Sequence, residues 1–185
     1  VLISLPNYAM FSAYTSMFGG KEVQHFYDKD LTLDIDQFLQ KINTNTSLAI
    51  ISNPGHTGTV LTETEMFRII EHAELNNSLV LIDEAYHHFY PKSMIGYINR
   101  FENLVLSRTF SKAFGLASLR IGLLIGCNKI IDELYKVKLV HEITGIAAKI
   151  GFYMLDNMNI VDQYVDNVNK GKSILYKRLK KIGFE

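Results

Sequence analysis

Short apolar runs alternate along this chain with longer segments of helical periodicity. The apolar runs, which we expect to be strands, lie at 1–4, 22–26, 47–52, 79–83, 103–108 and 120–126. Several of them lack polar alternation, which is typical of strands in a sheet that is covered on both faces. Helices are predicted between them at roughly 7–18, 34–43, 62–77 and 128–140. This alternation predicts an α/β fold with a mostly parallel sheet and helices on both faces.

Two segments have particularly clear helical signals. Thr62 can cap the helix at 62–77, and Glu65 stands three residues later, as a capping box requires. From Gly145 onward, apolar residues recur at spacings of about three and four, which is typical of helices packed on one face. The second pattern predicts a long helix towards the end of the chain.

The composition excludes several classes of protein. With 185 residues and 48% hydrophobic residues, the chain is large and apolar enough for a packed core. Lys and Arg together number 19, as do Asp and Glu, so no net charge favours nucleic acid or an anionic membrane. No apolar run approaches the ~18 residues that span a bilayer. The single cysteine, Cys127, cannot form an internal disulfide, which favours a reducing, cytoplasmic location.

Polar groups with useful chemistry follow two of the expected strands. Asp83 ends one apolar run and Tyr86 lies three residues later, while Thr109, Ser111 and Lys112 follow the next run. In parallel sheets, ligands bind at the carboxyl ends of strands. A lysine amine can form a Schiff base with an aldehyde, and a carboxylate can pair with a protonated ring nitrogen. These residues therefore predict a site for an aldehyde cofactor.

The chain resembles the aspartate aminotransferase superfamily in three spacings taken together: Asp-Xaa-Xaa-Tyr, Thr-Phe-Ser-Lys and Lys112 to Arg120. Within that superfamily it most resembles the histidinol-phosphate aminotransferase branch. The resemblance runs from about Pro6 to the end of the chain. It implies the type I fold of enzymes that use pyridoxal 5′-phosphate (PLP). Residues 1–156 would be part of the large, PLP-binding domain, and 157–185 a long helix leading towards a small C-terminal domain.

The resemblance assigns three catalytic residues, which also bind the cofactor. Lys112 would hold PLP covalently and, once released, move the Cα proton of the substrate. Asp83 would keep the pyridine nitrogen protonated, which preserves the ring as an electron sink. Tyr86 would hydrogen-bond the phenolic oxygen of PLP.

Further residues would complete the cofactor site. Thr109, Ser111 and Arg120 would bind the phosphate, and Tyr8 would stack on the pyridine ring. Because Arg120 is expected to open a strand, where an unpaired charge is costly, a phosphate partner is favoured for it. Arg108 is expected to form a structural ion pair instead.

The loop at 52–59 departs from the family pattern Asn-Pro-Xaa-Asn-Pro-Thr-Gly, in which the second asparagine contacts the phenolic oxygen. Here one residue is missing, and His56 stands where proline is usual. Asn53 is the candidate for this contact; alternatively, the contact is absent and Gly55 takes its place. His56 is expected to be a loop residue without a role; a contact with substrate is the alternative.

The resemblance implies a PLP-dependent aminotransferase of amino-acid biosynthesis that moves an amino group between an amino acid, or a histidinol phosphate-like amine, and a 2-oxo acid. A PLP-dependent decarboxylase or lyase on the same fold remains an alternative, as does a non-catalytic dimerisation remnant. Relatives are homodimers and about twice this length, so we expect a piece of a longer protein that binds PLP weakly or not at all when isolated. A metal site at His87 and His88 is not predicted, since adjacent side chains point apart on a strand.

Overall fold

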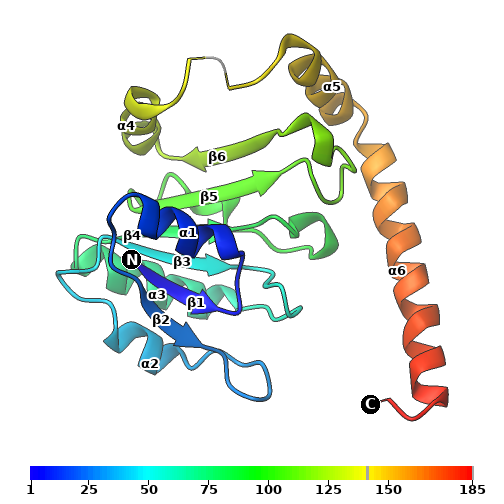
Figure 1. Cartoon of the computed structure of the whole chain (residues 1–185), viewed down its shortest axis with the longest axis horizontal. Coiled ribbons are helices and arrows are strands. Elements are labelled where there is room, and N and C mark those ends of the chain that lie inside the picture. The colour runs from blue at the N-terminus through cyan, green and yellow to red at the C-terminus, as the bar shows by residue number, and fades with distance from the viewer. Residues whose placement is uncertain (141, 185) are drawn as a thin grey trace. The chain divides into compact units, whose positions relative to one another are not determined.

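The computed structural model describes residues 1–140 and 142–184 (Figure 1). The strands are β1 (Leu2–Leu5), β2 (Val23–Phe26), β3 (Leu48–Ser52), β4 (Leu79–Asp83), β5 (Leu104–Thr109) and β6 (Gly122–Gly126). The helices are α1 (Ala9–Met17), α2 (Ile35–Gln40), α3 (Glu63–Leu75), α4 (Asn128–Val137), α5 (Gly145–Asp156) and α6 (Met158–Lys181). Three single-turn 3-10 helices are η1 (His87–Phe89), η2 (Ile95–Tyr97) and η3 (Ala117–Leu119).

The six strands form one sheet in the order β2-β1-β3-β4-β5-β6. All neighbouring pairs are parallel except β5 and β6, which are antiparallel. The predicted mostly parallel α/β sheet is therefore confirmed. Its register aligns Ser52 at the end of β3 with Asp83 on β4, and Asp83 with Ser107 on β5. Three polar side chains thus share one row at the carboxyl edge of the sheet.

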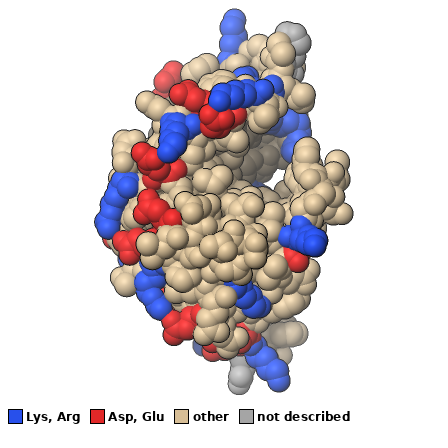
Figure 2. Space-filling model, turned by 90° about the vertical axis from the view of Figure 1, so that its left-hand side faces the viewer, with Lys and Arg blue, Asp and Glu red and all other residues tan. Residues whose placement is uncertain are grey.

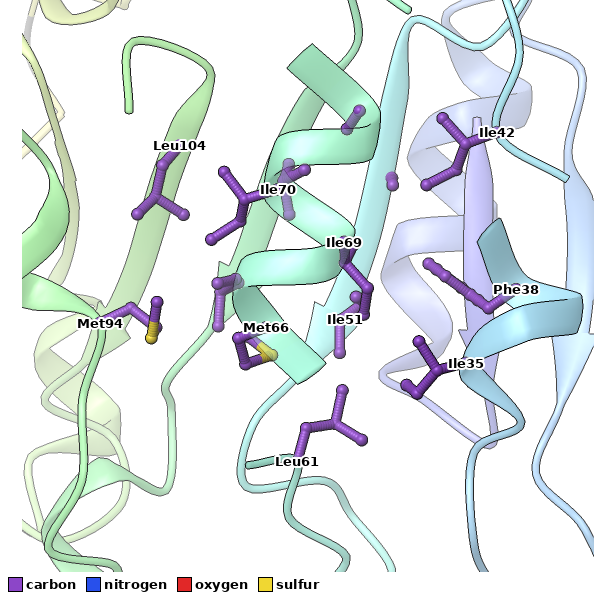
Figure 3. Close-up of a cluster of buried hydrophobic side chains, with 14 of the residues drawn as sticks. Ile35, Phe38, Ile42, Ile51, Leu61, Met66, Ile69, Ile70, Met94 and Leu104 are labelled. Atoms are coloured by element: carbon purple, nitrogen blue, oxygen red, sulfur yellow. The ribbon is translucent and has the colours of Figure 1, made fainter. Parts of the chain in front are cut away.

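Helix α3 supplies much of the core on one face of the sheet. It begins with the predicted capping box, in which the Thr62 hydroxyl accepts from the Glu65 N–H and the Glu65 carboxylate accepts from the Thr62 N–H. Its residues Met66, Ile69 and Ile70 are fully buried over the strands (Figure 3). Burial of each such side chain contributes on the order of 1.5–3 kcal/mol. Helix α1 lies on the other face of the sheet, in front of it in Figure 1.

The chain divides into two compact units. Unit 1 comprises 1–109 and 122–140 and contains the whole sheet with α1 to α4; unit 2 comprises 110–121 together with the described residues from 142 to 184. Within unit 2, Gly151 of α5 packs closely on the 110–121 segment, because a Cβ there would lie 3.3 Å from Ile121 Cδ1. Helix α6 follows α5 almost directly, and the domain division expected at 156/157 stays a prediction.

Charged side chains of both signs are interspersed on the face that Figure 2 displays. This distribution matches the equal numbers of acidic and basic residues in the sequence. Among the described residues, none of the helices is both long enough and apolar enough to cross a membrane.

Candidate functional site

The carboxylate of Asp83 is the centre of a hydrogen-bonded cluster at the carboxyl edge of the sheet. Ser107 Oγ donates to Asp83 Oδ1 over 2.9 Å, and the Ala85 N–H donates to the same oxygen over 3.2 Å. Ser52 Oγ lies 3.4 Å from Asp83 Oδ2. The strand register described above produces this cluster, because it aligns the three strand ends. The sequence analysis predicted Asp83 but neither serine.

Burial raises the pKa of Asp83 above its usual value, and the hydrogen bonds from Ser107 and Ala85, the charge of His56 and the Ser52 hydroxyl oppose that rise. The side chain is buried, with the residue only 9% exposed. Within the described residues, no Lys or Arg forms an ion pair with it. A buried carboxylate in this state favours a cationic or proton-sharing partner, because such a partner offsets the cost of desolvation.

Asn7 extends the Asp83 cluster by one residue. The Ser52 hydroxyl lies 2.5 Å from Asn7 Oδ1, so its single proton can be donated either to that oxygen or to Asp83. The amide nitrogen Nδ2 of Asn7 is buried and has no hydrogen-bond partner among the residues that the structure describes. An orphaned buried donor costs stability, and a ligand that accepts its hydrogen bond would remove that cost.

Three rings lie next to one another beside the Asp83 cluster. The His56 ring is parallel to Tyr8, with an interplanar angle of 3° and 6.5 Å between centroids. It is edge-on to Tyr86, with 5.5 Å between centroids. Unit 1 thus brings together the two tyrosines that the sequence predicted, and it adds His56, which the sequence analysis left without a role. The one residue that the loop at 52–59 lacks relative to the family pattern was the sequence signal that could have drawn attention to His56.

Asn53 is buried at the base of the same loop. Its Oδ1 accepts from the Leu61 N–H over 2.8 Å. Two backbone bonds, from Gly55 N to Thr59 O and from Gly58 N to Gly55 O, close the loop above it. Gly55 has no room for a side chain, because a Cβ would lie 2.7 Å from Thr59 Oγ1. The carbonyl group of Asn53 therefore holds the loop, and only its amide nitrogen is left for a ligand.

Arg108 forms the structural ion pair that was predicted for it. Its Nε and Nη2 donate to Glu84 Oε2 over 3.0 and 2.8 Å. Ser93 Oγ and the Met94 N–H also donate to this carboxylate. The network ties the end of β5 to the segment that follows β4, on which Tyr86 lies.

Ser111, Lys112 and Arg120 lie in unit 2, on the segment 110–121 that connects β5 to β6; Thr109 is the last residue of β5 in unit 1. A backbone bond from Phe110 N to Ile121 O closes the segment, and Gly115 N donates to Lys112 O. The Lys112 side chain is exposed. The pairing of Lys112 with Asp83 across one pyridine ring stays a prediction.

Arg120 differs from its predicted setting. The strand was expected to begin at Arg120, but β6 begins at Gly122. Arg120 is an exposed residue in a left-handed turn, with φ 54°, and its Nη1 donates to the Ala117 carbonyl. The argument from the cost of an unpaired charge in a strand is therefore wrong, since water solvates this guanidinium. Its role as a phosphate ligand stays a prediction that rests on the resemblance alone.

An open groove of about 410 Å³ lies at the opposite edge of the sheet, where β4 and β5 begin. Glu74, Leu79, Lys129 and Leu134 are among its lining residues. None of the residues predicted for the site lines this groove, so it is separate from the candidate site. In the described part of the chain, no group of three or more His, Cys, Asp or Glu side chains is arranged to hold a metal ion.

The chain is similar in sequence and in fold to several known proteins. Histidinol-phosphate aminotransferase from Clostridium novyi is 35% identical over 179 residues, which are 96% of this chain and 49% of that protein. The crystal structure of histidinol-phosphate aminotransferase from Clostridium acetobutylicum matches 99% of this chain and 56% of its own, with a TM-score of 0.90 and 24% identity. The enzyme from Sinorhizobium meliloti, solved in complex with pyridoxal-5′-phosphate, matches 92% of this chain and 47% of its own, with a TM-score of 0.81 and 24% identity.

The chain spans about half the length of the curated relatives it matches. The sequence model for aminotransferase class I and II matches residues 1–185. Because this sequence model covers the whole chain and a relative is 35% identical over 96% of it, the chain belongs to the class I and II aminotransferase family.

Proposed function

We propose that this protein is a PLP-dependent aminotransferase that moves an amino group between an amino acid, or a histidinol phosphate-like amine, and a 2-oxo acid. The observation that carries the proposal is the buried Asp83 carboxylate, which hydroxyl and N–H donors hold at the carboxyl edge of a parallel sheet. A protonated pyridine nitrogen is a suitable partner for such a group. The relatives named histidinol-phosphate aminotransferase support this choice of substrate.

The residues of unit 1 fit a flat aromatic ring that carries a basic nitrogen. Asp83 would hold a proton on the pyridine nitrogen, and the Tyr86 hydroxyl would donate to the phenolic oxygen. The exposed ring of Tyr8 would stack on one face of the pyridine. The orphaned Nδ2 of Asn7 is a further donor close to Asp83 through Ser52. When bound, PLP supplies a carbonyl that takes up the amino group and a ring that accepts electrons.

The residues around the end of β5 would perform the remaining tasks. Lys112 Nζ would hold the cofactor covalently and, once displaced by the substrate amine, would carry the substrate's Cα proton. Thr109 and Ser111 would donate hydroxyl protons to the phosphate, and the Arg120 guanidinium would neutralise part of its charge. Asn53 would support the site from the base of the loop at 52–59, where its side-chain carbonyl accepts the Leu61 N–H.

We further propose that the protein acts as a cytoplasmic homodimer. Helix α5 supports this assembly, because Ile146 and Phe152 are 72% and 70% exposed on it. Large apolar side chains left in water in this way are typical of surfaces that bind another protein.

The proposed function is tested by locating the covalent attachment of PLP. The full-length protein is incubated with PLP, reduced with borohydride and digested, and we expect the label on Lys112 alone. Lys112→Ala should lose the label and lower turnover by about 10⁴-fold, the upper range for an acid–base group. Lys129→Ala, which removes an exposed lysine of α4, is the matched control.

Product analysis separates amino transfer from decarboxylation. With a 2-oxo acid acceptor present, we expect the acceptor to be converted to its amino acid without release of CO₂. Label that remains in Lys112→Ala would refute the assignment of Lys112, and CO₂ release without amino transfer would refute the reaction.

A further inference from the structure

We propose that His56 contacts the cofactor, by donating an imidazole N–H to the phenolic oxygen of PLP beside Tyr86. This inference rests on the proposed function and deepens it. It moves to His56 a contact that the sequence pattern suggested for Asn53, and it is argued from the geometry of unit 1.

The first step is that Asn53 already has a structural task. Its Oδ1 accepts the Leu61 N–H over 2.8 Å in a buried setting. If the side chain turned towards a ligand, it would leave that N–H without a partner, at a cost of about 1–3 kcal/mol. Asn53 is therefore held as the base of the loop, and the loop directs a different residue outwards.

The second step is the position of His56 at the tip of this loop. The bonds between Gly55, Gly58 and Thr59 fix the tip, so the His56 ring has a defined location. That location is beside Tyr86 at 5.5 Å and parallel to Tyr8 at 6.5 Å, measured between ring centroids. The two tyrosines are the residues predicted to contact the phenolic oxygen and the ring of PLP. A ligand that reaches both must pass close to His56.

The third step is that His56 has donor capacity to spare. Within the described part of the chain, the His56 ring nitrogens form no hydrogen bond, and the residue is exposed. An imidazole carries at least one N–H donor in either protonation state. Its charge also acts on the buried carboxylate of Asp83. An anionic oxygen on the ligand therefore finds a donor at His56 that the protein itself does not use.

The chemistry predicts a measurable consequence. Negative charge on the phenolic oxygen stabilises the proton on the nearby nitrogen that joins Lys112 to PLP. A hydrogen-bond donor to that oxygen reduces its charge and so lowers the pKa of this nitrogen. Removal of the donor should therefore raise the pH at which the visible absorption band of bound PLP titrates. One hydrogen bond to a charged oxygen corresponds to a shift of about one pH unit.

The experiment compares three variants of the full-length protein loaded with PLP. In His56→Ala, we expect the titration midpoint to rise by about one unit and the dissociation constant for PLP to rise roughly fivefold to tenfold. His56→Asn, which keeps an N–H donor, should recover most of both changes. Val60→Ala, which shortens an exposed side chain directly after this loop, should leave both values unchanged.

The outcomes separate this inference from the proposed function. If the parent protein forms no Lys112-dependent absorption band, the proposed function fails and the inference fails with it. If the band forms but keeps its midpoint in His56→Ala, only the inference is overturned. A change confined to the KM for the amine would also overturn it, because His56 would then contact the substrate.

Discussion

Asp83 and Glu84 are neighbours at the end of β4, and both are shielded from water, with 9% and 3% of the residue exposed. Their partners differ. Glu84 accepts from Arg108, Ser93 and Met94, and its charge is neutralised inside the protein. Asp83 receives hydroxyl and N–H donors but no ion pair among the described residues.

This difference separates a carboxylate with a structural task from one that is suited to bind a ligand. A buried charge with a complete set of partners needs nothing further, whereas breaking its network is strongly destabilising. A buried charge held only by neutral donors keeps part of its desolvation cost until a cation arrives. The pKa of Asp83, raised by burial, expresses that cost. The comparison predicts that the two carboxylates respond to substitution in opposite ways.

The largest expected effect is on activity, in Asp83→Asn. An amide cannot stabilise a proton on the pyridine nitrogen, so turnover should fall by about 10³-fold. The stability of the protein without cofactor should fall by no more than about 1 kcal/mol, because the amide is cheaper to bury than the carboxylate. Single-turnover kinetics and urea unfolding measure the two quantities. Full turnover in this variant would contradict the assignment of Asp83 as the carboxylate that binds the cofactor.

The raised pKa of Asp83 also makes the stability of the parent protein depend on pH. In the folded protein, the Asp83 carboxyl keeps its proton to a higher pH than in the unfolded chain, where its pKa is near 3.8. Folding therefore takes up a proton at pH values just above 3.8. The free energy of unfolding of the cofactor-free protein therefore falls as the pH rises through this window. Asp83→Asn should lose that contribution, and an unchanged slope would contradict the assigned cause.

The next effect in size is on stability, in Glu84→Gln. This change leaves the partly buried Arg108 guanidinium without its counter-charge, and we expect the free energy of unfolding to fall by about 3 kcal/mol. Bound PLP should keep its absorption spectrum, because Glu84 takes no part in its binding. Urea unfolding and a spectral titration at a temperature where the variant is folded test both halves. A large loss of PLP affinity without destabilisation would reverse the roles of the two carboxylates.

The sequence predicted the sheet because its strands are short, apolar and separated by helices of suitable length. All six strands were predicted within about two residues, and the capping box at Thr62 was recognised because it is a local signal. The start of β6 was misplaced at Arg120, since the run of apolar residues does not reveal the left-handed turn before Gly122. Turn geometry of this kind depends on the partner strand.

For the site, the sequence indicated residues with distinctive chemistry but not those that orient them. Asp83 and Tyr86 were identified because they follow an apolar run at a characteristic spacing. Ser52 and Ser107 were not, because only the register between β3, β4 and β5 brings them to Asp83. His56 was passed over because its neighbours Tyr8 and Tyr86 are distant in sequence. Long-range pairing is the information that one sequence lacks.

The smallest expected effect comes from two matched serine substitutions that sharpen the comparison. Ser107 donates to Asp83 over 2.9 Å, and Ser93 donates to Glu84 over 2.8 and 2.9 Å. Each change to alanine removes one hydroxyl donor, worth about 1 kcal/mol. Ser107→Ala should weaken PLP binding by roughly fivefold, because loss of the donor raises the pKa of Asp83 further and disfavours its ionised form. Ser93→Ala should instead lower the free energy of unfolding by about 1 kcal/mol and leave PLP binding unchanged.

Both serine variants are measured by fluorescence titration with PLP and by urea unfolding. We expect a crossed pattern, in which Ser107→Ala loses PLP affinity and Ser93→Ala loses stability. If both variants lose stability and neither loses affinity, the hydroxyl at Ser107 serves packing alone, and Asp83 is as structural as Glu84. If the crossed pattern is found, the function of each carboxylate is set by the donors that the strand register places around it. Two carboxylates side by side at the end of one strand can then have different tasks at similar burial, because consecutive residues of β5 serve them: Ser107 gives Asp83 a neutral donor, and Arg108 gives Glu84 a counter-charge.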